Sequence, residues 1–346
     1  MTEQQLNEYS IYMLREVARS VGVESPTSKK KQQLINEILE ITEGKRAPKE
    51  KTKQGRPPKN FGYSFVDMLG QPQSTNIFFM QEQQKSNSQE GDIVSGYVEQ
   101  VNPNTAYLWV KNDTEYSCYF IPVQMFAKLN LKYGDLLNVE LGVGEEKMMV
   151  KEILSVNGTP IKKYDGKRKD FEKIAHILPN KKISFLNSVG NEIGSMFGES
   201  IYLYGNNNNQ NTETIIQLIN NCTETKKIYI NLSIAEKNKH FLNSIEGAEL
   251  FITNIMEGTD RARKIISLAI ERAKRICENG DNVVLFVDDV ISLWSIDEAS
   301  HTLVKKLMSL TRNGGKKGSI SLFAIMSGDN ELKVFEKLAD KRIILN

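Results

Sequence analysis

The stretch from Ser200 to Ile325 alternates short apolar runs with helix-like segments, and this order constrains the fold more than any other feature of the chain. The apolar runs are IYLY, KIYINL, AELFIT, NVVLFV and SISLFAI, and helices are expected near 213–220, 235–244, 261–278 and 299–311. Strands that alternate with helices favour a parallel sheet covered by helices. We therefore predict an α/β domain at residues 183–346.

The segment GNNNNQNT, from Gly205 to Thr212, lies between the first strand and the first helix of this domain, where a phosphate-binding loop belongs. In the pattern G-x-x-x-x-G-K-[ST], the second Gly lets backbone N–H groups surround phosphate, the Lys reaches the outer phosphates, and the hydroxyl ligates Mg²⁺. Gly205 and Thr212 keep the first Gly and the hydroxyl, whereas Gln210 and Asn211 replace the second Gly and the Lys. An ordinary Asn-rich turn is the alternative interpretation.

The run VVLFVDD, from Val283 to Asp289, is an apolar strand that ends in acid. A carboxylate at such a strand end holds Mg²⁺ in nucleotide-binding α/β folds. Many buried strands end in Asp, but the combination of this strand with GNNNNQNT upstream is a more specific signal than either feature alone. We predict a degenerate nucleotide site whose residues are Gly205, Gln210, Asn211, Thr212 and Asp288.

Residues 91–157 follow a period of two instead. The strands IVSGYVEQV, AYLWV, YSCYFI, LLNVEL and KMMVKEIL are interrupted by one short helix at 123–129. Five short strands with one helix describe an OB-type barrel.

Aromatic residues gather on two neighbouring strands of this barrel, and OB folds bind single strands by stacking bases on such rings. The candidate RNA-binding residues are Tyr107, Trp109, Tyr119 and Phe120. Because neighbouring strand residues face opposite sides, Tyr119 and Phe120 cannot both face outward. The alternative is that these rings fill the barrel core.

The first 43 residues show apolar positions at helical spacing, interrupted near Gly22 and Pro26, and predict a small helical unit. Residues 44–90 form a basic, flexible linker, and GKRAPKEKTKQGRPPK within it is rich in Lys, Arg and Pro. Such a tether can contact phosphates without reading sequence, and a merely solubilising linker is the alternative. Its candidate contacts are Lys45, Arg46, Lys53, Arg56 and Lys59. A second basic run, IKKYDGKRKDFEK, lies in the connector at 158–182.

Composition argues against several other classes of protein. The 346 residues are 40% hydrophobic and 25% charged, with a net charge of +2, as in ordinary globular proteins. No run approaches the roughly 18 apolar residues of a spanning helix, and the polar start lacks a signal-peptide core, so we expect a cytoplasmic protein without a membrane partner. The three cysteines and three histidines are scattered, and no G-x-S-x-G elbow occurs, so we expect neither a metal site nor a hydrolase triad.

The order of helical unit, barrel and α/β domain resembles the bacterial transcription termination factor Rho. YVEQVNPNTAYLWV and CYFIPVQMFAKLNLKYGDLL look like the primary RNA-binding domain of that family, and SLAIERAKRICENGDNVVLFVDD is similar to its motor helix and Walker B strand. The terminal KLADKRIILN is similar to a segment that precedes the end of that motor. The resemblance implies a Rho-N/SAP-like helical unit, a cold-shock-like OB barrel and a RecA-like P-loop NTPase domain. It also implies single-stranded RNA as a partner and RNA-dependent ATPase and helicase activity.

The sequence departs from this family at several positions. The family's stacking aromatics fall on Tyr107 and Phe120, but the first aromatic of its G-F-G-F element meets Thr105, a loss for which Trp109 could compensate. The strand that carries the family's catalytic Glu ends here in Ile230-Asn231-Leu232. The family's RNA-gripping loops correspond to short segments, and the chain stops before the region of its arginine finger. We therefore expect RNA binding in transcription termination or its regulation, without ATP hydrolysis and with no certain need for ATP or Mg²⁺.

Two alternative functions follow from other features. The degenerate motor could dock onto true Rho or the transcription complex and modulate termination. The N-terminal helical unit and GRPPK, Gly55 to Lys59, could instead bind A·T-rich DNA, because GRPPK resembles an AT-hook core, which suits the minor groove of such DNA.

Overall fold

The computed structural model describes two compact units, within Met1–Pro72 and Gln73–Asn346, and each is considered by itself. The described residues are 6, 14–15, 17–18, 21–23, 25–42, 45 and 89–345, with gaps in the last range at 103–104, 113–114, 144–147, 187, 206–207, 233–241, 254–257, 296 and 327–334. Across these described ranges, no helix has the length and apolar character needed to cross a membrane.

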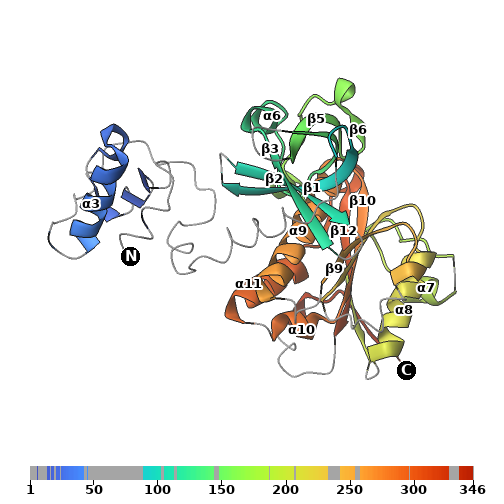
Figure 1. Ribbon diagram of the computed structural model, residues 1–346. Helices are drawn as coiled ribbons and strands as arrows, with labels where there is room; N and C mark the ends of the chain where they lie inside the picture. The colour runs from blue at the N-terminus through green and yellow to red at the C-terminus, as the bar shows by residue number, and fades with distance from the viewer. Residues whose placement is uncertain are drawn as a thin grey trace. The chain divides into compact units, whose positions relative to one another are not determined.

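The N-terminal unit is helical, as its apolar spacing predicts. A 3₁₀ turn, η1 (Pro26–Ser28), precedes α3 (Lys31–Thr42), drawn in blue in Figure 1. Leu34, Ile35 and Ile38 of α3 are buried against apolar side chains from earlier in the chain. The backbone N–H of Lys30 donates to Oε1 of Gln33 at 3.1 Å, which satisfies one donor at the start of the helix.

The barrel has the five strands and the helix that the period of two predicts. Its elements are β1 (Ile93–Asn102), β2 (Thr105–Asn112), β3 (Glu115–Ile121), α6 (Val123–Lys128), β4 (Leu136–Val143), β5 (Met148–Val156) and a short β6 (Thr159–Pro160). The strands run in the order β3-β2-β1-β4-β5-β6, and a parallel pairing of Phe120 with Met149 joins β3 to β5. Leu108, Leu137 and Val139 are fully buried inside.

The third part is a parallel sheet with helices on both faces. Its first elements are α7 (Ser188–Ile193), β7 (Ser200–Tyr204), α8 (Asn208–Asn221), β8 (Lys226–Asn231), β9 (Ala248–Ile252) and α9 (Thr259–Glu278). Its later elements are β10 (Asn282–Asp288), α10 (Val290–Trp294), α11 (Glu298–Met308), β11 (Arg312–Asn313), β12 (Ser319–Met326) and β13 (Lys341–Ile344). The strand order is β13-β7-β12-β10-β8-β9, with β11 antiparallel beside β12. The predicted α/β layout is confirmed.

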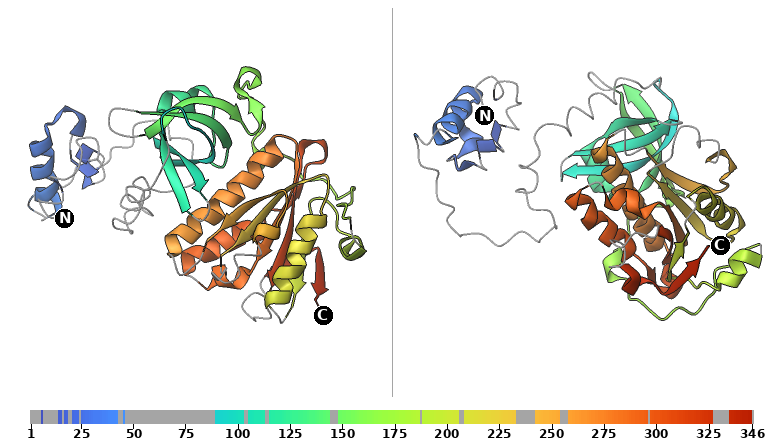
Figure 2. Two further views of the ribbon diagram at one scale, coloured as in Figure 1. Left: turned by 45° about the vertical axis from the view of Figure 1, so that its right-hand side comes forward. Right: turned by 90° about the horizontal axis from the view of Figure 1, so that it is seen from below.

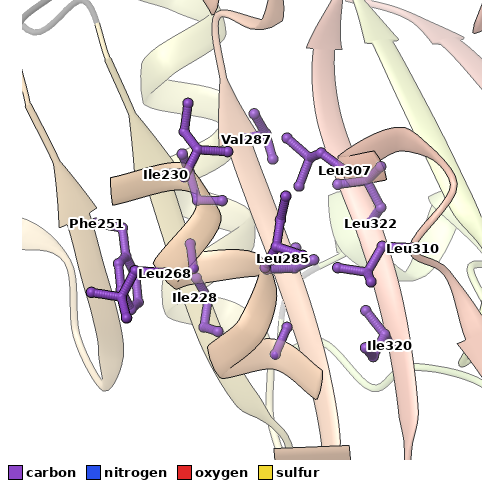
Figure 3. Packing of buried hydrophobic residues seen from close by; sticks show 14 of the residues in the cluster. Ile228, Ile230, Phe251, Leu268, Leu285, Val287, Leu307, Leu310, Ile320 and Leu322 are labelled. Carbon is purple, nitrogen blue, oxygen red and sulfur yellow. The ribbon is translucent and has the colours of Figure 1, made fainter. Parts of the chain in front are cut away.

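Alternation along the central strands builds two cores. Leu285 of β10 lies in register with Ile228 of β8 and Leu322 of β12, and Figure 3 shows these side chains on the face that α9 covers. Phe286 and Phe323 point to the opposite face, where their rings stack at 5.4 Å. Figures 1 and 2 show α9, α10 and α11 on one side of the sheet and α8 on the other. A strand buried on both faces has no polar side, which is why β10 is almost continuously apolar.

Two details differ from the sequence prediction. Helix α8 begins at Asn208 rather than at 213, so the helix includes the second half of GNNNNQNT. The edge strand β13 was not predicted because four residues carry little periodic signal. Tertiary contacts fix it instead: the backbone N–H of Ser200 donates to Oδ2 of Asp340 at 2.8 Å, directly before β13. The helix expected at 235–244 lies mostly outside the described residues.

Helix α9 also joins the barrel to the sheet. Nε and Nη2 of Arg272 each lie 2.8 Å from the Glu249 carboxylate of β9, and Nη1 donates to Oδ1 of Asn157 in the barrel at 2.6 Å. The hydroxyl of Tyr97 in β1 donates to the same carboxylate at 3.0 Å. Asn157 continues the network by donating to Asp135, which also accepts from Arg168. Because these charges are buried, the two domains are held in one geometry by directional contacts.

We predict that Arg272→Ala lowers the free energy of unfolding by about 3 kcal/mol, because it leaves the Glu249 carboxylate unpaired in a mostly buried position. The side chains of Arg272 and Glu249 are 6% and 23% exposed. Urea unfolding followed by tryptophan fluorescence measures the effect, because Trp109 lies in this interface.

Arg342→Ala is the matched control, since the side chains of the Arg342–Glu336 pair are 50% and 34% exposed. Such a surface pair contributes less than about 1 kcal/mol. An equal loss of unfolding free energy in the two variants would show that the buried network does not stabilise the barrel and the α/β domain.

Candidate functional site

Asn211 of α8 packs against Gly205, the first residue after β7. Asn211 is 2% exposed, and its Nδ2 donates to the backbone carbonyl of Gly205 at 3.1 Å. A Cβ added to Gly205 would lie 1.9 Å from Oδ1 of Asn211, so the amide packs directly against the glycine backbone. The Asn211 amide thus bridges the start of the loop and the first turn of α8. The Gln210 side chain lies outside the described residues.

Thr212 and Asp288 meet although they are 76 positions apart in the chain. The hydroxyl of Thr212 donates to Oδ2 of Asp288 at 2.7 Å. Two residues of β8 donate to the same oxygen: the Tyr229 hydroxyl at 3.0 Å and Nδ2 of Asn231 at 3.1 Å. Asn231 is the register partner of Asp288, so the ends of adjacent parallel strands bring the two side chains together. Three neutral donors therefore satisfy one carboxylate oxygen.

Burial raises the pKa of Asp288 to about 6, and hydrogen bonds from Thr212, Tyr229 and Asn231 oppose that rise. Among the described residues, no Lys or Arg forms an ion pair with this carboxylate. The neighbouring Asp289 has a φ of 67° and caps α10 by accepting from the Ser292 N–H at 3.0 Å, and its negative charge adds to the rise in the pKa of Asp288. The site therefore places one buried carboxylate among hydroxyl and amide groups.

Sequence analysis missed the part that Tyr229 and Asn231 play in this cluster. Asn231 appeared there only as the residue at a strand end where a catalytic Glu was expected. A usable signal existed, because carboxyl ends of neighbouring parallel strands meet at one edge of a sheet, and both KIYIN and NVVLFVD end in a polar residue.

In the barrel, Tyr107 and Phe120 form a pair on the outer surface. They are register partners on β2 and β3, their ring centroids lie 6.1 Å apart at 72°, and both side chains are half-buried. Two partly exposed rings on adjacent strands offer flat apolar surface to a base.

The other two candidate aromatics are buried, each at 1% exposure. Tyr119 lies in the barrel core. The Trp109 ring packs against Tyr116 at 5.4 Å, and the Lys264 ammonium of α9 lies 5.3 Å from its centroid. In this arrangement α9 covers the Trp109 end of the outer face, and the Tyr107–Phe120 end keeps its partial exposure.

A buried acid, Glu99, lies beside the aromatic pair on the neighbouring strand. Glu99 of β1 is the register partner of Tyr107 and is 8% exposed, with the Lys264 ammonium 3.4 Å away. Burial raises the pKa of Glu99, while the positive charge of Lys264 opposes the rise. The Glu99–Lys264 pair, which the sequence did not indicate, connects the aromatic face to α9.

The candidate tether contacts are mostly beyond the described residues. Lys45 is described and exposed, whereas Arg46, Lys53, Arg56 and Lys59, and with them GRPPK, lie outside. Within the described part of the chain, no group of three or more His, Cys, Asp or Glu side chains could hold a metal ion.

Comparison with known proteins places these features in a family context. Residues 5–42 match the family model described as the N-terminal domain of the Rho termination factor. Transcription termination factor Rho of Akkermansia muciniphila is 22% identical over 283 residues, which cover 72% of this chain and 60% of that protein. The chain thus spans less than two thirds of that relative. A solved structure described as a prototypical ATPase from the type III secretion system of pathogenic bacteria matches with a TM-score of 0.43 and 14% identity, over 50% of this chain and 58% of that one.

The raised pKa of Asp288 predicts a pH-dependent stability. A carboxyl whose pKa is higher in the folded state stabilises the fold below its unfolded pKa, near 3.8, and this contribution is lost as the pH rises through about 6. Asp288→Asn keeps an acceptor oxygen without the charge. The free energy of unfolding of this variant, relative to that of the wild type, should rise by roughly 2–3 kcal/mol between pH 4 and pH 7, at about 1.4 kcal/mol per pKa unit.

Urea unfolding of both proteins across this pH range measures the gain. Asp281→Asn, on the exposed turn before β10, controls for the loss of one negative charge. A difference between wild type and Asp288→Asn that stays constant from pH 4 to pH 7 would contradict the prediction.

Proposed function

The chain is a distant member of the Rho family, and we propose that it binds single-stranded RNA through its barrel and acts in transcription termination or its regulation. The Tyr107–Phe120 pair carries this proposal. These are the two positions to which the resemblance to Rho assigns base stacking, and they are the half-buried pair on the outer face. A cytoplasmic location is part of the same proposal.

We propose further that the α/β domain does not hydrolyse ATP. In phosphoryl transfer, a P-loop Lys neutralises charge on the phosphates and a positioned polar or acidic group orients the attacking water. Here the Lys position holds Asn211, whose amide donates to the Gly205 carbonyl, and the position of the family's catalytic Glu holds Asn231, which donates to Asp288. Asp289 does not supply the missing carboxylate, because it caps α10.

The geometry supports a structural part for this domain instead. Its central strands β10 and β12 are buried on both faces, and α9 holds the barrel through Arg272. Docking onto true Rho or a transcription complex stays an alternative within the same process. Binding of A·T-rich DNA through the N-terminal helical unit and GRPPK is a further alternative, and its GRPPK part lies outside the described ranges.

We predict that Tyr107→Ala and Phe120→Ala each weaken binding of single-stranded RNA by about 1–3 kcal/mol, the usual contribution of one stacked base. Fluorescence anisotropy with a labelled oligonucleotide measures the affinity. Tyr204→Ala, which removes a partly buried ring from the α/β domain, is the matched control. Stronger competition by A·T-rich duplex than by unlabelled RNA would favour the DNA alternative.

We predict that ATP turnover is at background with and without RNA, and that Asn211→Lys alone does not restore it, because Asn231 still lacks a carboxylate. A coupled phosphate-release assay, with an active Rho protein as positive control, measures the rate. RNA-stimulated ATP hydrolysis that disappears in Asp288→Asn would contradict the proposal that the α/β domain does not hydrolyse ATP.

A further inference from the structure

The second basic run of the sequence, Ile161–Lys173, leaves the barrel and lies beside the turn Gly314–Gly318, which connects β11 to β12. Nη1 of Arg312, next to this turn, donates to the backbone carbonyls of Phe171 at 2.8 Å and Ile174 at 3.2 Å. The Arg312 guanidinium also lies 4.4 Å from the centroid of the Phe171 ring. The connector and the turn are therefore fixed side by side.

The turn itself is held against the end of α9. Gly318 has a φ of 87°, and a Cβ there would lie 2.6 Å from the backbone oxygens of Asp281 and Cys277. The thiol of Cys277 also approaches the Lys317 carbonyl at 3.9 Å. This backbone can pass so close only at a glycine, and it leaves the side chains of Lys316 and Lys317 exposed.

Besides Lys173, which pairs with Asp170, the two segments carry six exposed lysines, and we call these six the lysine patch. They are Lys162, Lys163, Lys167, Lys169, Lys316 and Lys317. Lys169 and Lys317 come from the two different segments, and the positive charge of Lys317 lowers the pKa of Lys169. Two ammonium groups held together repel each other, and a bound anion would relieve that repulsion.

The acids of the connector are engaged with other cations. The Asp170 carboxylate lies 2.6 Å from both Lys132 and Lys173, and these hydrogen bonds hold its pKa far below the usual range. Glu172 pairs with Lys274 of α9 at 3.3 Å. Exposed Asp165 and Asp281 remain beside the six lysines, so the described patch keeps an excess of positive charge.

We infer that the lysine patch is a second contact surface for the phosphates of the single-stranded RNA whose bases stack on the barrel. The inference rests on the proposed RNA binding at Tyr107 and Phe120. Exposed lysine side chains contact phosphates and do not read bases. The lysine patch would therefore strengthen RNA binding and fix the position of the RNA on the protein without adding sequence preference.

The position of the patch favours a strand that continues from the barrel. Phe120 pairs with Met149 at the start of β5, and β5 leads to Val156, from which β6 and Lys162 follow. The seven steps along β5 correspond to roughly 23 Å at about 3.3 Å per residue. An RNA of a few nucleotides can thus cover the aromatic pair without reaching the lysine patch, whereas a longer RNA can contact both.

The test compares a short and a long RNA. A variant with Lys163, Lys169, Lys316 and Lys317 changed to Gln is titrated with unstructured oligonucleotides of about 6 and about 25 nucleotides, the shorter lying within the roughly 4–16 that one OB fold covers. The affinity of the long RNA should fall about tenfold or more at low salt. The slope of log K against log salt should shrink by roughly 0.7 for each phosphate that the variant no longer neutralises. The short RNA should bind as to the wild type.

The matched control changes four exposed lysines elsewhere to Gln, which gives the same net charge. These are Lys182, Lys226, Lys305 and Lys337. A control variant that loses as much affinity for the long RNA as the patch variant would overturn the inference, because the effect would be one of net charge alone. An unchanged affinity and salt slope in the patch variant would overturn it as well.

The short RNA separates the two proposals. If the wild type binds the short RNA through Tyr107 and Phe120 but the patch variant binds the long RNA normally, the inference that the lysine patch contacts RNA is wrong and the proposed function stands. If the wild type binds neither RNA, the proposed function fails and the inference falls with it. Loss of A·T-rich duplex binding in the patch variant, with long RNA binding retained, would overturn the choice of RNA as partner.

Discussion

The buried ion pair between Arg272 of α9 and Glu249 of β9 is the contact on which the arrangement of barrel and α/β domain depends. Arg272 is 5% exposed, and its three bonded nitrogens divide between Glu249 and Asn157 of the barrel. Tyr97 closes the network from β1. Buried charges are tolerated only when they are paired and hydrogen-bonded, so this geometry allows few alternative placements of one domain on the other.

This placement determines what the barrel can offer to a ligand. Because α9 crosses the outer face of β1 and β2, Lys264 lies over Trp109 and pairs with Glu99, and the Trp109 end of the face is closed. The Tyr107–Phe120 end stays partly exposed. The connector that leaves the barrel is fixed by Arg312 to the turn before β12, which gathers lysines from two distant parts of the chain. The placement of the barrel on the α/β domain thus covers part of the outer face of the barrel and brings the lysine patch together.

The hydrogen bonds around Asp288 show how a buried carboxylate is accommodated at the end of a central strand. The carboxylate accepts from a hydroxyl of α8 and from two side chains of β8. These neutral donors tie the start of α8 to β8 and β10, so the cluster contributes to the packing of this domain.

The elements and their order could be predicted from the sequence, because a period of two and a period near 3.6 are set by local backbone geometry. The predicted features include the five barrel strands, helix α9, the parallel sheet, and the polar loop at Gly205 with its partner acid Asp288. The periodicity could not show that Trp109 is covered or that the connector lies beside the turn before β12. Both depend on contacts between residues distant in sequence, because α9 packs over Trp109 and Arg312 holds the connector to the turn. The bond between Asn231 and Asp288 was likewise decided by the parallel pairing of β8 with β10.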